Sequence, residues 1–143
     1  MRFFLLWLLS VGLSLTRLVS AQTLGPQDEL DIRTTLEGAI RALEAEDSDG
    51  LLAILDPASP LREQAGSLSK SFFGTYDLRY ELESIQPGNA TPDGVEVRTT
   101  LLIRRIGGAA FRDVRATALG LMRKTAEGWK LYTGRVEKRE QLK

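Results

Sequence analysis

Histidine and cysteine are both absent from this chain of 143 residues. Without histidine there is no Ser-His-Asp type of catalytic triad and no imidazole ligand for a metal ion. Without cysteine there is no thiol nucleophile, no thiolate metal site and no disulfide bond. The two absences exclude the commonest routes to nucleophilic and metal-based catalysis. We therefore expect neither a cofactor nor a metal site.

The chain also lacks an excess of charge of one sign, since 19 Lys and Arg residues stand against 19 Asp and Glu residues. This balance argues against general binding of nucleic acid. The charges are nevertheless segregated, because residues 22–96 carry a net charge of −10 and residues 97–143 carry +8. Either the acidic and basic halves lie against each other in one domain and neutralise each other's charge, or a basic face of the sheet attracts an anionic partner.

The chain has one long hydrophobic run, Phe3 to Leu15, which follows Arg2 and precedes the small residues at positions 19–21. These are the parts of a secretory signal peptide, and we expect cleavage after Ala21. This run of 13 residues, interrupted only by Ser and Gly, falls short of the roughly 20 that span a membrane. The alternative is an uncleaved N-terminal anchor, which would be the chain's sole contact with a membrane. The prediction is an exported protein, secreted or periplasmic, with residues 22–143 as a single domain.

The first half of this domain is predicted to be helical. Pro26 suits the first turn of a helix, and apolar residues then recur on one helical face: Ile32, Leu36, Ala39, Ile40 and Leu43. A second, short helix is expected over residues 48–55, with Ser48 as its cap. A third is expected over residues 59–72.

From Tyr76 onward the period of the apolar residues changes from 3.6 to 2. The segment YDLRYELES alternates apolar and charged residues, as in a strand with one wet and one covered face. Further strands are expected at residues 95–105, 114–122 and 129–133, with a turn region at residues 87–94. The charged tail, residues 137–143, is expected to fray. Helices followed by strands indicate an α+β domain, with three N-terminal helices packed on an antiparallel four-stranded sheet.

The segment AIRALEAEDSDGLLAILDP at residues 39–57, followed by a third helix and long antiparallel strands, resembles the nuclear transport factor 2-like superfamily. Ketosteroid isomerase, scytalone dehydratase and polyketide cyclase-like proteins share that architecture. The resemblance covers about residues 27–140. It implies a cone in which a curved sheet wraps the helices around an apolar pocket, and a homodimer formed through the sheet. The superfamily contains isomerases, dehydratases, hydrolases and binding proteins, so the resemblance does not choose among them.

The side of the sheet that faces the helices is expected to be mainly apolar. Its polar side chains are Tyr76, Tyr80, Thr99, Trp129 and Thr133. Each needs a hydrogen-bond partner if buried, which either a ligand or the backbone and water would supply. These five residues are the candidate ligand-binding residues, and the expected ligand is small and apolar.

No catalytic residue stands out on that side. The strand carboxylates all fall on the solvent phase: Asp77, Glu81, Glu83 and Glu96. Asp113 is the weak catalytic candidate, either a surface salt-bridge partner or a carboxylate turned inward by a bulge. The sequence thus favours an exported, non-catalytic binding module that uses a pocket or docks a partner through its sheet. The alternatives are an envelope isomerase, dehydratase or hydrolase that uses a pocket Asp and a Tyr, and a structural dimer without an open pocket.

Overall fold

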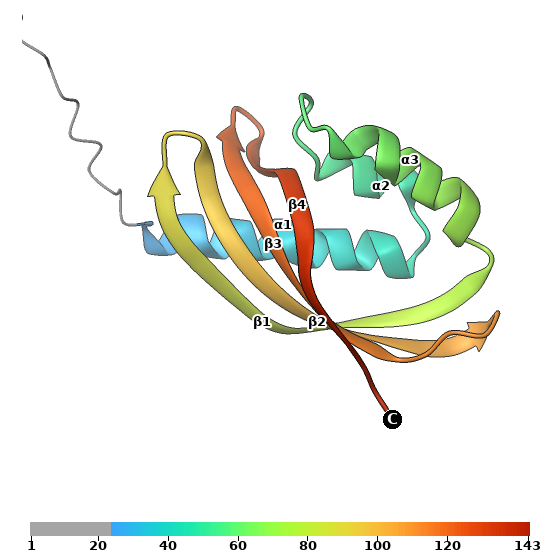
Figure 1. Cartoon of the computed structure of the whole chain (residues 1–143). Coiled ribbons are helices and arrows are strands. Elements are labelled where there is room, and N and C mark those ends of the chain that lie inside the picture. Colours follow the sequence, from blue (N-terminus) through green and yellow to red (C-terminus); the bar gives the residue numbers. More distant parts are fainter. Residues whose placement is uncertain (1–23) are drawn as a thin grey trace, which may run out of the picture.

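The computed structural model describes residues 24–143, so the predicted signal peptide lies outside the described residues. The described chain forms three helices followed by four strands (Figure 1). This order confirms the predicted α+β class.

Each helix begins where the local sequence can satisfy its first backbone N–H groups. Helix α1, Pro26–Glu44, starts at a proline, which has no N–H to satisfy. Helix α2, Ser48–Ala53, is capped by the Asp47 side chain, which accepts a hydrogen bond from the Gly50 N–H at 2.9 Å. Helix α3, Leu61–Phe72, starts after Ser59, whose hydroxyl accepts from the Leu61 N–H at 3.1 Å. The expectation of a Ser48 cap is therefore wrong by one residue.

The four strands form one sheet in the order β1-β2-β3-β4, with each strand antiparallel to its neighbours. They are β1 (Tyr76–Thr91), β2 (Gly94–Gly108), β3 (Val114–Thr125) and β4 (Gly128–Gln141). The sheet is strongly curved, and the helices lie in its concave side (Figure 1). This arrangement is the expected cone.

Two strands are longer than predicted. β1 runs through the expected turn at residues 87–89 by means of an irregular pairing between Pro87 and Ala90, and the tight turn lies only at Pro92 and Asp93. β4 continues to Gln141, which pairs with Val114. The charged tail therefore belongs to the sheet, and the expectation that it frays is wrong.

The end of the concave face at which the β1–β2 and β3–β4 turns lie is called the narrow end below. Helix α1 covers it. Its buried Ile32 packs against Val95, Val97, Met122 and Trp129. A second core cluster joins the three helices: Ala42, Leu51, Leu55 and Ala65. The segment after α2 also pairs with the edge of β4, since Leu131 exchanges backbone hydrogen bonds with Ile54 and Asp56. The opposite end of the concave face, formed by the start of β1 and the end of β4, is called the wide end below, and α3 reaches it through Phe72, whose ring packs on Tyr76.

Two bulges decide which side chains of β4 face the helices. Tyr132 has no partner between the pairs Met122–Leu131 and Leu121–Thr133, so the residues after it change sides. Thr133 consequently shares the outer face with Glu96, the partner of Leu121, and not the covered face as expected. A second shift, at Glu137, returns Arg139 and Gln141 to the inner face opposite Ala116 and Val114.

Candidate functional site

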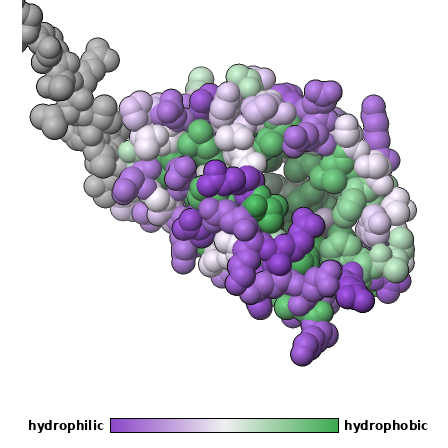
Figure 2. All heavy atoms as spheres, in the orientation of Figure 1, coloured by the Kyte–Doolittle hydropathy of each residue, from purple (hydrophilic) through white to green (hydrophobic). Residues whose placement is uncertain are grey.

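The wide end of the cone contains a hollow of about 430 Å³, which we call the cone hollow. Its walls come from α3, from all four strands and from the β2–β3 loop: Phe72, Tyr76, Leu78, Tyr80, Ile103, Ala110, Phe111, Arg112, Val114, Arg139 and Gln141. The volume falls within the range of about 300–1,000 Å³ that is usual for small-molecule pockets. Figure 2 shows the molecule hollowed between the helices and the sheet, with hydrophobic side chains around the opening.

The walls of the cone hollow are apolar and largely aromatic. The Tyr76 ring lies 4.6 Å from the Phe72 ring and 6.0 Å from the Phe111 ring, centroid to centroid, with an edge-to-face geometry for the second pair. Leu78 and Val114 are buried among these walls. Such a surface favours an apolar or aromatic ligand body.

Two tyrosine hydroxyls supply hydrogen-bonding capacity in the cone hollow. Within residues 24–143, neither the Tyr76 hydroxyl nor the Tyr80 hydroxyl forms a hydrogen bond with a protein group. Burial raises the pKa of Tyr80, and the charges of Glu44 and Glu46 raise this pKa further. Tyr80 therefore stays protonated at neutral pH and is available as a hydrogen-bond donor.

The mouth of the cone hollow is basic. Arg112 donates a hydrogen bond from Nη1 to Gln141 Oε1 at 3.3 Å, and Arg139 lies two residues before Gln141 on the same side of β4. No Asp or Glu lines the hollow. Among the described residues, neither guanidinium forms an ion pair with a carboxylate, unlike Arg98 and Arg115.

Asp113, the candidate catalytic carboxylate, does not line the cone hollow. Its Oδ1 accepts a hydrogen bond from the Arg105 N–H at 2.9 Å, and its backbone carbonyl accepts from the Leu142 N–H at 2.9 Å. These bonds tie the β2–β3 loop to the end of β4. The structure gives Asp113 a bracing role in this loop, and it forms no ion pair among residues 24–143.

The five candidate ligand-binding residues do not gather at one place. Tyr76 and Tyr80 share the cone hollow, whereas Thr99 lies further along the inner face in a second hollow of about 240 Å³. Trp129 is only 8% exposed and lies in the core at the narrow end. Thr133 is on the outer face.

Sequence reasoning missed Arg112, Arg139 and Gln141 as parts of the site. The predicted last strand ended at Thr133, so Arg139 and Gln141 were assigned to a fraying tail. One signal was available, since the predicted third strand, which begins at Val114, needs a partner of equal length.

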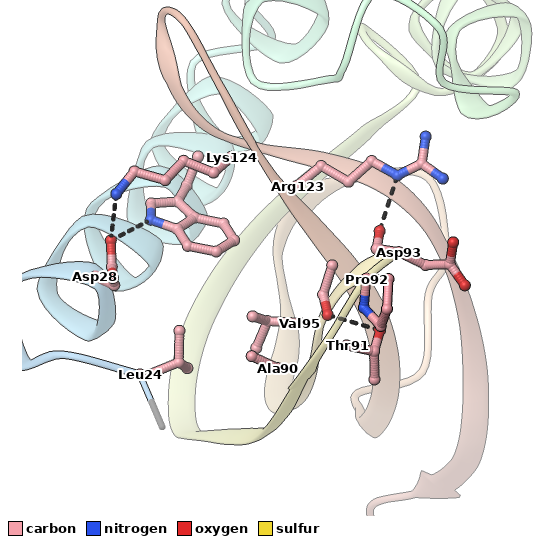
Figure 3. A pocket seen from close by; sticks show the side chains of 11 residues that line it. Leu24, Asp28, Ala90, Thr91, Pro92, Asp93, Val95, Arg123 and Lys124 are labelled. Atoms are coloured by element: carbon pink, nitrogen blue, oxygen red, sulfur yellow. Dashed lines mark hydrogen bonds and ion pairs between the residues drawn. The ribbon is translucent and has the colours of Figure 1, made fainter. Parts of the chain in front are cut away.

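A third hollow, of about 430 Å³, lies at the narrow end beside the start of α1 (Figure 3). Asp28 Oδ1 accepts hydrogen bonds from Lys124 Nζ at 2.9 Å and from Trp129 Nε1 at 3.1 Å. The hydrogen bond from Lys124, and to a smaller extent the one from Trp129, lower the pKa of Asp28. Arg123 donates to the Asp93 carbonyl at 3.0 Å. These hydrogen bonds connect α1 to β3 and β4, and β3 to the β1–β2 turn, so we assign the groups that form them a structural role.

Neither a metal centre nor a membrane span is found in the part of the chain that the structure describes. No three or more Asp and Glu residues of residues 24–143 are grouped so that they would hold a metal ion. No helix in the same range is both long and apolar enough to cross a membrane.

The fold defines the chain as a nuclear transport factor 2-like α+β cone. A protein with a cystatin-like fold from Nostoc punctiforme is 16% identical, with a TM-score of 0.62 over 80% of this chain and 93% of that one. A nuclear transport factor 2-like protein of unknown function from Pseudomonas putida is 14% identical, with a TM-score of 0.61 over 84% and 96%. The hexachlorocyclohexane dehydrochlorinase LinA-type3 from Novosphingobium barchaimii is 14% identical, with a TM-score of 0.60 over 82% and 94%. These similarities show the fold alone.

A family model described as the anti-sigma-I factor RsgI9, C-terminal domain, matches residues 34–142. The chain therefore belongs to this family. No curated protein matches the chain at a significant level.

Proposed function

We propose that the chain is an exported, non-catalytic binding module that holds a small, largely apolar molecule in the cone hollow. One observation carries this proposal: the hollow has aromatic and aliphatic walls and two tyrosine hydroxyls without a hydrogen-bond partner in residues 24–143, but no lining carboxylate. Binding needs the first two features. Acid–base catalysis needs a group that gains or loses a proton near the working pH, and such a group is missing from the lining.

The chemistry of Tyr80 also favours binding over catalysis. An isomerase, dehydratase or hydrolase of the alternative kind would pair a carboxylate base with a tyrosine acid. Asp113 is occupied with the Arg105 N–H, and the raised pKa of Tyr80 makes its hydroxyl a weaker acid at neutral pH. The similarity to the dehydrochlorinase shows the fold alone and gives no support to an enzyme.

The family gives the binding role a context. It is described as the C-terminal domain of an anti-sigma-I factor, and a domain that binds a molecule without converting it would suit a protein of that regulatory kind. Export is supported by the signal-peptide pattern before Gln22. Mass measurement of the protein recovered from the envelope or the medium tests export, and the expected mature chain begins at Gln22.

Native mass spectrometry of the mature protein, purified from its own envelope, tests the proposed function. A small molecule that remains bound is the expected result, whereas a ligand-free dimer would favour the structural-dimer alternative and overturn the proposal. Turnover of a substrate that Asp113→Asn abolishes would favour the enzyme.

A matched pair of substitutions on β2 locates the site. Ile103 lines the cone hollow, so Ile103→Trp should fill it and abolish retention of the small molecule. Ile106 is 55% exposed and lies outside that lining, so Ile106→Trp is the control and should retain the ligand. Equal retention by both variants would place the ligand elsewhere.

A further inference from the structure

The mouth of the cone hollow carries two positive charges that no carboxylate of residues 24–143 pairs with. Arg112, in the β2–β3 loop, and Arg139, on β4, both line the hollow and are exposed. Other arginines of the sheet have carboxylate partners at close range, such as Arg98 with Glu137 at 2.9 Å and Arg115 with Glu83 at 2.7 Å. Arg112 and Arg139 form no such ion pair among residues 24–143, and they line the cone hollow.

The carboxylates next to these arginines in sequence are engaged elsewhere. Asp113 follows Arg112 directly, but its Oδ1 accepts from the Arg105 N–H. Glu140 follows Arg139 directly, but its side chain lies on the outer face of the sheet and forms an ion pair with Lys138. The local sequence thus offers a counter-ion to each arginine, and the fold turns both counter-ions away from the hollow.

We propose that the ligand of the cone hollow carries a carboxylate, which Arg112 and Arg139 bind at the mouth while the apolar body lies among Phe72, Tyr76 and Phe111. The ligand class is a fatty or aromatic carboxylic acid. This inference rests on the proposed function. The planar, forked guanidinium is the side chain best matched to a carboxylate, since it donates two parallel hydrogen bonds.

The other polar side chains that line the hollow can also donate hydrogen bonds to a carboxylate. The amide nitrogen of Gln141 and the hydroxyls of Tyr76 and Tyr80 are further donors, and the Gln141 side-chain oxygen already accepts from Arg112. Donors and positive charges therefore surround the mouth, and apolar groups surround the interior. A neutral apolar molecule would use the interior but not the mouth.

Isothermal titration calorimetry with octanoate and 1-octanol tests the inference, because the two probes share an apolar chain and differ in charge. The wild-type protein should bind octanoate about tenfold more tightly than octanol, which corresponds to about 1.4 kcal/mol. The double variant Arg112→Gln/Arg139→Gln should lose this preference and bind the two probes equally. Because both arginines are exposed, the variant should keep its folded far-ultraviolet circular dichroism spectrum.

Two further variants separate specific recognition from net charge. Arg79→Gln/Arg104→Gln removes the same charge from a register pair on the outer face and should keep the octanoate preference. Arg112→Lys/Arg139→Lys keeps the charge and should restore part of the preference.

The outcomes distinguish the two proposals. Equal binding of octanoate and octanol by the wild type would overturn the carboxylate inference and leave the proposed function standing. An unchanged octanoate preference in the Gln variant would also overturn the inference. Binding of neither probe by the wild type would overturn the proposed function, and the inference with it.

Discussion

Glu83 on β1 and Arg115 on β3 form a bidentate ion pair that crosses the intervening strand β2 on the outer face of the sheet. Arg115 Nε and Nη2 lie 2.7 Å and 3.0 Å from the two carboxylate oxygens of Glu83. Leu102 of β2 is the register partner of Arg115 and is only 3% exposed. The ion pair and the neighbouring long side chains therefore shield an apolar residue on a face that has no covering helix.

We expect Glu83→Gln to lower the free energy of unfolding at neutral pH but not in acid. The hydrogen bonds and charge of Arg115 lower the pKa of Glu83 in the folded protein. Its stabilising contribution is therefore present above the unfolded pKa of about 4.3 and is lost as the pH falls through the lowered folded pKa. Urea denaturation of both proteins between neutral pH and acid measures the difference.

Glu81→Gln is the matched control for this prediction. Glu81 lies on the same face of β1 opposite Leu102 and forms no ion pair among residues 24–143. A constant difference between wild type and Glu83→Gln across the whole pH range would contradict the role of this pair. High salt should reduce the difference at neutral pH.

We expect Trp129→Phe to reduce stability without affecting ligand binding. The substitution removes the hydrogen bond from the indole to Asp28 Oδ1 and leaves a gap beside Ile32. The expected loss is at least about 1.5 kcal/mol, the lower value for a hydrogen bond to a charged group. Thermal denaturation measures it. Loss of octanoate binding in a folded Trp129→Phe protein would instead move the ligand to the narrow end.

We expect opposite effects from alanine at two glycines. Gly94 has φ of +136° at the start of β2, and a Cβ there would collide with the Met122 carbonyl oxygen. Gly94→Ala should therefore destabilise the protein by about 1–3 kcal/mol. Gly66 lies within α3, where a Cβ would meet no atom within 4 Å.

Gly66→Ala should accordingly stabilise the protein by up to about 1 kcal/mol, because alanine favours the helix. Urea denaturation of both variants gives the comparison. A destabilised Gly66→Ala protein would show that the exposed side of α3 is occupied by another group.

We expect Asp113→Ala to lower stability by about 1 kcal/mol, because the Arg105 N–H loses its acceptor. Asp113→Asn keeps an oxygen acceptor and should lose less. Denaturation measurements on both variants, together with octanoate titrations, check this. If Asp113→Asn changed octanoate affinity, the carboxylate would have to reach the cone hollow.

The fold class could be predicted from the sequence because its signals are local. Pro26, the apolar face of Ile32 and Leu36, and the alternation from Tyr76 to Ser84 each reflect the period of one element. The structure confirms the nuclear transport factor 2-like fold that the resemblance of residues 39–57 and the order of the elements implied.

The mouth of the site could not be predicted in the same way. The position of Arg139 depends on the bulges at Tyr132 and Glu137, and a bulge arises from the pairing of distant strands rather than from a residue's own propensity. For Trp129, the local pattern predicted the covered side of the sheet correctly. It could not predict the hydrogen-bond partner of the indole, since Asp28 lies 101 residues away in the sequence. The structure brought Tyr76 and Tyr80 together, because the irregular pairing between them places its extra residue, Ile106, on β2 and leaves the alternation along β1 intact.

Because of the two bulges in β4, the ligand preference of the cone hollow depends on the number of residues in this strand as well as on their type. One amino acid lost between Leu131 and Gln141 would point both mouth donors of this strand, Arg139 and Gln141, away from the cavity without altering a single lining side chain on β1 or β2. Insertions and deletions in this short segment would therefore offer such a cone a direct route to a new binding preference.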